Sequence, residues 1–526
     1  MSPDSDLQPS SHIVFQTYEA WGHTRPLCNL SARILRIRPT YITFFIIHSL
    51  YDRVKNELGR SFEANEAHLS RLVRVIALRP DTPDPVNTQA VDAQFAEAYA
   101  ELVAGKPVTC KHTNVEYDAA PAPDIALVDF FAVDPLRTIR SLSTKPVKVF
   151  TWYSGAASSI IPGFGPTHMG GKSDRYVQVK EEVSRTGRDL NEVAMELIHG
   201  PRGEVVRVPG LPPMYDHEYV SPQEMPATIQ MGIIFVKAYD CFTESDGIVH
   251  SLPECYEPEA LAAVRQMCAA SNRNMYSFGP LVPSGTLAVD NDLKQSDKGA
   301  EIHEFLDSVL KSHGPQSLVY WSFGSVWWPT DANKVWEVLD VLMEKKIPFI
   351  MSQASPFAVV PDAVKEKIKK FGLGLLAPWT PQQTILSHPA TGWFLTHAGL
   401  NGVMEALTCG VPMICWPLSA EQPSNAVHLT ANLNVAYELL EVRSGNGLKP
   451  IFRLGKTPVG TIEAARAEAH EVLDRAFGED GAKKRENAQK MKEAIERCWD
   501  ANGTSTTDLV SFVDSLSLPE REAVLL

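Results

Sequence analysis

The chain has 526 residues, of which 44% are hydrophobic and 21% charged, and its formal net charge is −14. This length exceeds what one typical hydrophobic core organises and predicts two domains of about 200–250 residues each. The excess of acidic residues argues against general nucleic-acid binding, which usually requires a basic surface.

The first half of the chain alternates short apolar runs with amphipathic stretches. Runs of this length, separated by helical patterns, are typical of parallel strands in βαβ units. The strands expected here are residues 12–17, 41–47, 72–78, 124–128 and 147–151.

Two polar residues follow expected strands in this half. His23 lies in the segment after the first strand, and Asp129 comes directly after the fourth. Ligands of doubly wound sheets bind at the carboxyl ends of strands. There a neutral imidazole can take a proton from a hydroxyl group, and a carboxylate can orient that imidazole. The ordinary alternative is an exposed His and a surface or capping Asp, and Asp134 is a second candidate partner for His23.

A stretch rich in Pro, Gly, Asp and Lys separates the two halves, as linkers often do. It begins near residues 279–285 and ends near Gly314. We therefore expect a first domain over residues 1–280, a linker over 281–314, a second domain over 315–490 and a C-terminal helical segment over 491–526.

The second half repeats the pattern of short apolar runs. Two such series predict an α/β fold with two Rossmann-like domains, each built on a parallel sheet. The strands expected in this half are residues 317–323, 348–351, 374–376, 391–395 and 411–416.

His397, Asn401 and Glu405 follow an expected strand at intervals of four residues. If a helix begins near Gly399, Asn401 and Glu405 lie one turn apart on the same face. A strand followed by Gly and a helix N-terminus is a natural pyrophosphate site, because the free N–H groups face the anion. Glu405 could then accept hydrogen bonds from ribose hydroxyls, and Trp379 offers a flat face for a base. The ordinary alternative is a solvated helix face and a core Trp.

The segment from Trp379 to Gln422 resembles the signature box of UDP-glycosyltransferases, the family that includes the plant secondary-product enzymes. Its length equals that of the plant box. Two positions depart from the family pattern: Leu400 stands where Trp is usual, and Gly402 where Ser is usual. The matching stretches are WTPQQTILSHP (379–389), GWFLTHAGLN (392–401), EAL (405–407), GVPMICWPL (410–418) and AEQ (420–422), with Asn425 beyond them.

A second match lies near the N-terminus. Gly22, His23 and Pro26 resemble the Gly-His-x-x-Pro motif that carries the catalytic base of the same family. The resemblance implies that His23 is the general base and that Asp129, rather than Asp134, orients it. It spans nearly the whole chain and is weakest over residues 155–230, where acceptor-binding loops would lie.

The resemblance implies two facing Rossmann-like domains of the GT-B type, the first binding the acceptor and the second the UDP-sugar, with the C-terminal helix crossing back to the first domain. It also implies sugar transfer from a UDP-sugar to a hydroxyl of a small lipophilic acceptor such as a phenol, sterol or terpenoid. Inversion would give a β-glycoside, and Gln422 points to glucose as the sugar. The residues expected to bind the UDP-sugar are Ser325, Trp379, Thr380, Gln382, His397, Gly399, Leu400, Asn401, Gly402, Glu405, Glu421 and Gln422.

Metal binding was weighed because many glycosyltransferases of another fold use an Asp-x-Asp motif. Residues 4–6 and 290–292 fit that pattern, but the first lies in the N-terminal tail and the second in the linker. Charge on the departing UDP can instead be met by His397, Asn401, Ser325 and a helix N-terminus. We therefore expect no metal and no cofactor beyond the UDP-sugar co-substrate.

The ends of the chain carry no sign of targeting to a membrane. Residues 1–11 are polar and acidic, unlike a secretory signal peptide, and no apolar run approaches the roughly 18 residues that span a bilayer. The eight cysteines show no regular pairing, so neither a zinc site nor a disulfide framework is indicated. We expect a cytoplasmic protein without an integral membrane anchor.

Two other functions are compatible with a UDP-sugar site. A UDP-sugar epimerase on a similar scaffold would convert the sugar without an acceptor, and a non-catalytic protein would bind the UDP-sugar without turnover. The presence of both His23 and Asp129 argues against the second alternative, because binding UDP alone requires neither.

Overall fold

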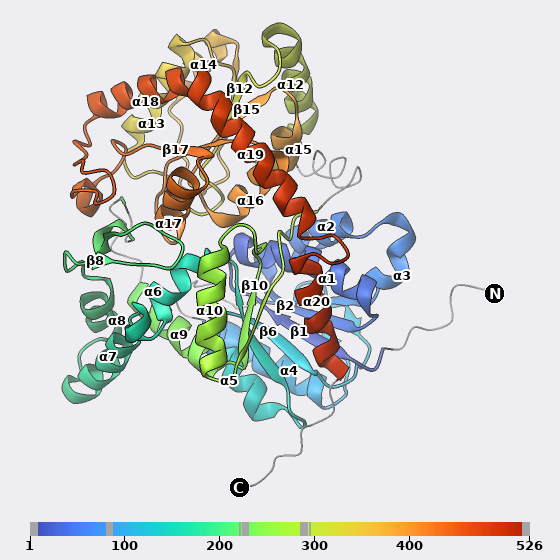
Figure 1. Cartoon of the computed structure of the whole chain (residues 1–526). Helices are drawn as coiled ribbons and strands as arrows, with labels where there is room; N and C mark the ends of the chain where they lie inside the picture. The colour runs from blue at the N-terminus through green and yellow to red at the C-terminus, as the bar shows by residue number, and fades with distance from the viewer. Residues whose placement is uncertain are drawn as a thin grey trace.

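The computed structural model describes residues 9–79, 88–219, 222–223, 231–283, 293 and 296–517. These residues form two lobes, each built around a parallel sheet (Figure 1). This is the predicted α/β architecture of two Rossmann-like halves. Among the described residues, no helix is both long and apolar enough to cross a membrane.

The sheet of the first lobe has seven strands in the order β11-β10-β7-β6-β1-β2-β3. After β1 the chain builds β2 and β3 on one side, then returns to build β6, β7, β10 and β11 on the other. The topological switch point therefore lies between β1 and β6. The strands are β1 (His12–Gln16), β2 (Tyr41–Ile47), β3 (Val73–Leu78), β6 (Ile125–Asp129), β7 (Lys148–Tyr153), β10 (Gly247–His250) and β11 (Asn274–Ser277).

The sheet of the second lobe has six strands in the order β14-β13-β12-β15-β16-β17, and its switch point lies between β12 and β15. The apolar pattern predicts every strand of the two sheets except β10, β11 and β17, which have only three or four residues each. The strands are β12 (Leu318–Ser322), β13 (Phe349–Ser352), β14 (Gly374–Ala377), β15 (Thr391–Thr396), β16 (Met413–Cys415) and β17 (Ala436–Glu438).

Helices surround both sheets, and the first lobe also contains two short antiparallel hairpins. Most strand residues are buried, as expected of parallel sheets covered on both faces. The first lobe contains α1 (Trp21–Ile37), α2 (Tyr51–Ser61), α3 (Ala67–Ser70), α4 (Gln89–Val103), α5 (Val133–Leu142), α6 (Ile160–Phe164), α7 (Ser173–Thr186), α8 (Leu190–Ala194), α9 (Met231–Glu244) and α10 (Pro258–Ala270), with the hairpin strands β4 (Val108–Thr109), β5 (Glu116–Tyr117), β8 (Val205–Val206) and β9 (Met214–Tyr215). The second contains α12 (Gly299–His313), α13 (Ala332–Glu344), α14 (Asp362–Phe371), α15 (Gln382–Ser387), α16 (Leu400–Cys409), α17 (Gln422–Val427) and α18 (Ile462–Ala476).

The two lobes share apolar packing. One cluster of buried side chains runs from Ile248 in β10 to Met404 in α16, so the hydrophobic core continues across the interface. Tyr256, after β10, lies edge-on to His428 beyond α17 with ring centroids 4.8 Å apart. His428 Nε2 also lies 2.6 Å from the Tyr256 carbonyl. The lobes are therefore held together on one side of the interface by buried contacts.

The C-terminal helices cross from the second lobe to the first, as the resemblance implied. Figure 1 shows α19 (Glu479–Arg497) running from the upper lobe to the lower and α20 (Thr504–Asp514) lying in the lower. The Phe512 ring of α20 packs 5.5 Å from Tyr276 and 5.7 Å from Phe278. An Asp508 carboxylate oxygen accepts a hydrogen bond from the Ser277 N–H.

The expected division of the chain at residues 280, 314 and 490 stays a prediction. Much of the linker lies outside the described residues, and residue 490 falls within α19.

Replacing Phe512 with Ala is expected to lower the free energy of unfolding by about 3–5 kcal/mol. The side chain is completely buried against aromatic rings of the first lobe, so its loss leaves a cavity. Val510→Ala, on the same helix at a position 37% exposed, is the control and should change little. Denaturant unfolding measures both, and equal small losses would show that α20 does not stabilise the first lobe.

Candidate active site

His23 and Asp129 meet at the switch point of the first sheet. Asp129 ends β6 and is fully buried, and β6 pairs with β1. His23 lies in the first turn of α1, which begins at Trp21, rather than in a loop before the helix as its position suggested. Its Nδ1 lies 2.7 Å from Asp129 Oδ2. Asp129 Oδ1 accepts a hydrogen bond from the Phe131 N–H, which fixes the orientation of the carboxylate.

Aromatic side chains surround the His23 imidazole. Its ring stacks on Phe130 and Phe131, with centroids 5.3 and 5.7 Å away. Trp152 Nε1 donates a hydrogen bond to the His23 carbonyl and anchors this turn of α1. The side chain remains 21% exposed, so the imidazole is accessible to solvent.

The charge environment raises the pKa of His23. Burial is the largest influence and by itself lowers the pKa, because it disfavours the imidazolium. The charge of Asp129, the hydrogen bond to it and the charge of Glu421 in the second lobe together outweigh burial. The imidazolium is therefore stabilised where a base must accept a proton.

Asp134 is not the partner of His23 in this structure. It lies in the first turn of α5, where its carboxylate is 2.8 Å from Lys237 Nζ. The resemblance favoured Asp129, and the geometry brings Asp129 rather than Asp134 to the imidazole.

His397 lies at the switch point of the second sheet, after β15. Two glycines contact its ring: a Cβ on Gly324 would lie 2.8 Å from it, and a Cβ on Gly399 would lie 2.4 Å from Nε2. Burial lowers the pKa of His397 to about 4, against an opposing hydrogen bond that the ring donates to the Ser322 backbone. The imidazole is thus neutral near pH 7.

Helix α16 begins at Leu400, with Gly399 as its N-cap, as the spacing predicted. Asn401 Nδ2 donates to the Gly22 carbonyl of the first lobe at 2.7 Å. Glycine at position 22 suits this approach, because a Cβ there would lie 3.0 Å from the Asn401 amide nitrogen. The helix N-terminus and the turn that carries His23 are therefore in direct contact.

Glu421 lies beside the N-terminus of α16. Its Oε1 accepts a hydrogen bond from the Leu400 N–H at 3.3 Å. Burial raises the pKa of Glu421, while that hydrogen bond and the charge of His23 act in the opposite direction. Glu421 thus lies at the N-terminus of α16 and interacts electrostatically with His23 of the first lobe.

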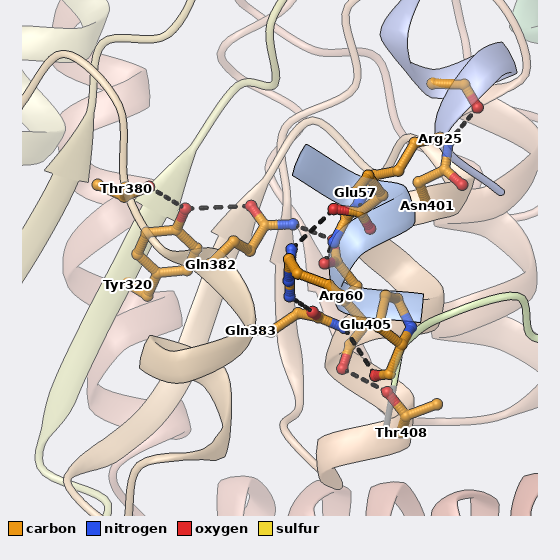
Figure 2. Close-up of polar contacts among 12 residues, drawn as sticks. Arg25, Glu57, Arg60, Tyr320, Thr380, Gln382, Gln383, Asn401, Glu405 and Thr408 are labelled. Atoms are coloured by element: carbon orange, nitrogen blue, oxygen red, sulfur yellow. Dashed lines mark hydrogen bonds and ion pairs between the residues drawn. The ribbon is translucent and has the colours of Figure 1, made fainter. Parts of the chain in front are cut away.

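Glu405 lies one turn beyond Asn401 and is only 2% exposed. Its Oε2 accepts a hydrogen bond from Gln382 Nε2, and Gln382 Oε1 accepts one from the Tyr320 hydroxyl at 3.0 Å. Thr380 Oγ1 lies 2.7 Å from the same hydroxyl. Figure 2 shows these side chains converging from four places: Tyr320 from β12, Thr380 from the loop before α15, Gln382 from α15 itself and Glu405 from α16.

Three charged residues of the first lobe extend this network, and the sequence patterns did not single them out. Arg25 Nη1 donates to Glu405 Oε1 at 2.8 Å, and Arg25 Nε donates to Glu57 Oε1 at 2.9 Å. Glu57 Oε2 accepts from Arg60 Nη1 at 2.8 Å, and Arg60 also donates to Gln383 (Figure 2). The one available signal was the place of Arg25 inside the Gly-His-x-x-Pro motif.

The other residues predicted to bind the UDP-sugar differ in how many of their groups are already in contact with the protein. Trp379 is contacted on its ring by the Arg53 guanidinium, 4.7 Å from the centroid. Ser325 lies half-buried in the turn after β12. The side-chain oxygen of Gln422, Oε1, accepts hydrogen bonds from the Leu418 and Ser419 N–H groups. Only the side-chain nitrogen of Gln422 is therefore left for a ligand.

The two departures from the family box have different structural consequences. The Leu400 side chain is 3% exposed and belongs to the apolar cluster shared by the lobes, so it contributes packing. At Gly402 a Cβ would meet nothing closer than Phe394 at 3.4 Å, which leaves room for a serine.

One group of possible metal ligands occurs among the described residues: His303, Asp307 and His388. His388 Nδ1 accepts a hydrogen bond from the Ala390 N–H, so a neutral ring carries its proton on Nε2, 3.3 Å from Asp307. This arrangement suits a hydrogen bond better than coordination. The acidic pairs at residues 4–6 and 290–292 lie outside the described residues.

Comparison with known proteins gives consistent matches. The family model for UDP-glucoronosyl and UDP-glucosyl transferases matches residues 273–447. The chain is 31% identical over 520 residues to UDP-glycosyltransferase eriJ of Hericium erinaceus, covering 96% of this chain and 98% of that protein. It is 24% identical over 519 residues to anthocyanidin 3-O-glucosyltransferase 5 of Manihot esculenta, covering 95% and 94%.

Solved structures share the fold. Phytolacca americana UGT2, complexed with UDP-2fluoro-glucose and pterostilbene, matches with a TM-score of 0.66 and 21% identity over 97% of this chain and 100% of that chain. A UGT transferase from Siraitia grosvenorii in complex with UDP matches with a TM-score of 0.66 and 19% identity, covering 97% and 100%.

Gly324→Ala is expected to destabilise the protein more than Gly372→Ala. Both glycines have positive φ, +77° and +74°, where an L side chain costs about 1–2 kcal/mol. Only at Gly324 would the new methyl group also collide with the His397 ring, because nothing lies within 4 Å of a Cβ at Gly372. Denaturant unfolding compares the two variants, and equal losses would contradict the close packing of His397 on Gly324.

Proposed function

Because the chain belongs to the UDP-glycosyltransferase family, we propose that it transfers glucose from UDP-glucose to a hydroxyl group of a small lipophilic acceptor, with inversion at the anomeric carbon. The observation that carries this proposal is the contact between the turn that carries His23 and the N-terminal end of α16. A base oriented by a buried carboxylate lies beside a helix terminus suited to a diphosphate.

In the proposed reaction the acceptor oxygen attacks the anomeric carbon of the sugar, and the bond from that carbon to the UDP oxygen breaks. His23 takes the proton from the acceptor hydroxyl, and Asp129 stabilises the imidazolium that forms. The electron pair of the broken bond leaves with UDP. A single displacement at the anomeric carbon converts an α-linked donor into a β-glycoside.

The leaving diphosphate gains negative charge as this bond breaks. The free N–H groups and positive dipole end of α16, the neutral imidazole of His397 and the amide of Asn401 are groups that can stabilise it. Ser325, in the turn next to His397, is a further candidate donor. These groups support a reaction that needs no metal ion.

The proposals for sugar and acceptor have separate support. Gln422 at the end of the box favours glucose, and relatives named for glucosyl transfer act on anthocyanidin and hydroquinone according to their names. The aromatic side chains beside His23, chiefly Phe130, Phe131 and Tyr18, favour a lipophilic acceptor.

Incubation with UDP-glucose and a panel of phenols and sterols tests the proposal. Mass spectrometry is expected to show addition of one hexose to at least one acceptor with release of UDP, and proton coupling constants should show the β-anomer. UDP-glucose incubated without an acceptor should be recovered unchanged. Failure to transfer from any UDP-sugar would overturn the proposal.

His23→Ala is expected to reduce the transfer rate about 10²–10⁴-fold, the usual contribution of a general base. His68→Ala is the control, because His68 is exposed on α3. Steady-state rates with a saturating donor compare them. Wild-type rates in the His23 variant would exclude it as the base.

The rate of transfer should fall on the acid side as pH drops through the raised pKa of His23, because only the neutral imidazole can accept a proton. Asp129→Asn removes the charge that raises this pKa, so the acid limb should move to lower pH. The maximal rate should also fall, because the imidazolium loses its partner. An acid limb that stays in place would show that His23 does not govern it.

A further inference from the structure

Glu405 is the predicted ribose ligand, yet both oxygens of its carboxylate have donors from the protein. Arg25 of the first lobe binds Oε1, and Gln382 of the second lobe binds Oε2. With these partners in place the Glu405 side chain is 2% exposed. Ribose hydroxyls can therefore reach the carboxylate only if one of the two partners moves.

Arg25 is the partner that can move and still keep a bond to a carboxylate. It is 16% exposed and has a second carboxylate partner, Glu57, in its own lobe. Glu57 is in turn paired with Arg60 on α2. The guanidinium can thus leave Glu405 and keep its bond to Glu57, whereas a buried Glu405 needs a replacement donor.

A second arginine of the first lobe contacts another predicted nucleotide ligand. Arg53, on α2, lies over the Trp379 ring that is expected to stack on the base. Arg25 and Arg53 therefore occupy groups predicted to hold the ribose and the base. Gln382 and Gln383, adjacent in the box, both bind within the same network.

We propose that Arg25 sets the affinity of the donor site for uridine nucleotides, because its bond to Glu405 is exchanged for bonds from the ribose hydroxyls when the nucleotide binds. This rests on the proposed function for the identity of the ligand. The hydroxyl groups of the ribose replace the guanidinium as hydrogen-bond donors to Glu405. Binding then breaks the contact between α1 and α16, so Arg25 competes with the nucleotide for Glu405 and lowers the affinity for UDP.

The test measures the affinity for UDP alone by titration calorimetry in wild-type protein, Arg25→Met and Arg36→Met. Arg25→Met keeps the length of the side chain and removes its hydrogen-bond donors. The Kd for UDP is expected to fall about tenfold, because one charge-assisted hydrogen bond no longer has to be broken. Arg36 is the matched control on the same helix, where it pairs with the partly exposed Glu66 of its own lobe, and its variant should bind UDP as wild type does.

Ligands with altered ribose distinguish exchange from general electrostatics. In wild type, 2′-deoxy-UDP is expected to bind more weakly than UDP, and Arg25→Met should keep or increase this discrimination, because Glu405 then depends on the ribose hydroxyls and Gln382 alone. Arg25→Lys is the second variant if Arg25→Met does not fold. One ammonium group cannot bridge Glu57 and Glu405 as the guanidinium does, so its Kd should also fall below wild type.

Weaker or unchanged UDP binding in the Arg25 variants would overturn the exchange and indicate a structural or supporting role. Absence of UDP binding in every variant would overturn both the exchange and the proposed function. Tight UDP binding without transfer from any UDP-sugar would overturn the proposed function alone and leave the exchange standing.

Discussion

All strands of each sheet run parallel, so their carboxyl ends lie along one edge of each lobe. Both candidate half-sites occur where the strand order reverses. His23 and Asp129 flank the gap between β1 and β6, while Gly324 and His397 flank the gap between β12 and β15. At these gaps the helices that follow the strands diverge to opposite sides, which leaves space for ligands. The contact between Asn401 and Gly22 then brings one edge against the other.

The pKa of His23 is raised and the pKa of His397 is lowered, and each shift has an identifiable cause. His23 has a buried carboxylate at its Nδ1, and that charge outweighs desolvation. His397 is packed between glycines and has no such carboxylate among its pKa influences, so desolvation prevails. One imidazole is thus suited to accept a proton, and the other is neutral near pH 7.

Features that depend on local periodicity could be predicted from the sequence. The strands were visible as apolar runs, and the spacing of Asn401 and Glu405 placed them on one face of α16. Strand ends indicated Asp129 and Asp134 as possible partners of His23, and only the family resemblance favoured Asp129. The partners of Glu405 could not be predicted, because Arg25 is 380 residues away and meets it only through the packing of the lobes. The hydrogen bonding of the Gln422 side-chain oxygen likewise depends on a turn that no residue pattern predicts.

The chain passes between the lobes twice, once through the linker and once through α19, and α20 is fastened to β11 by Phe512 and Asp508. Two lobes joined by one connecting segment can both twist and bend relative to each other. Two connecting segments define a line about which rotation of one lobe against the other is easiest. The two connections of the chain therefore restrain twisting of one lobe against the other more than bending about that line.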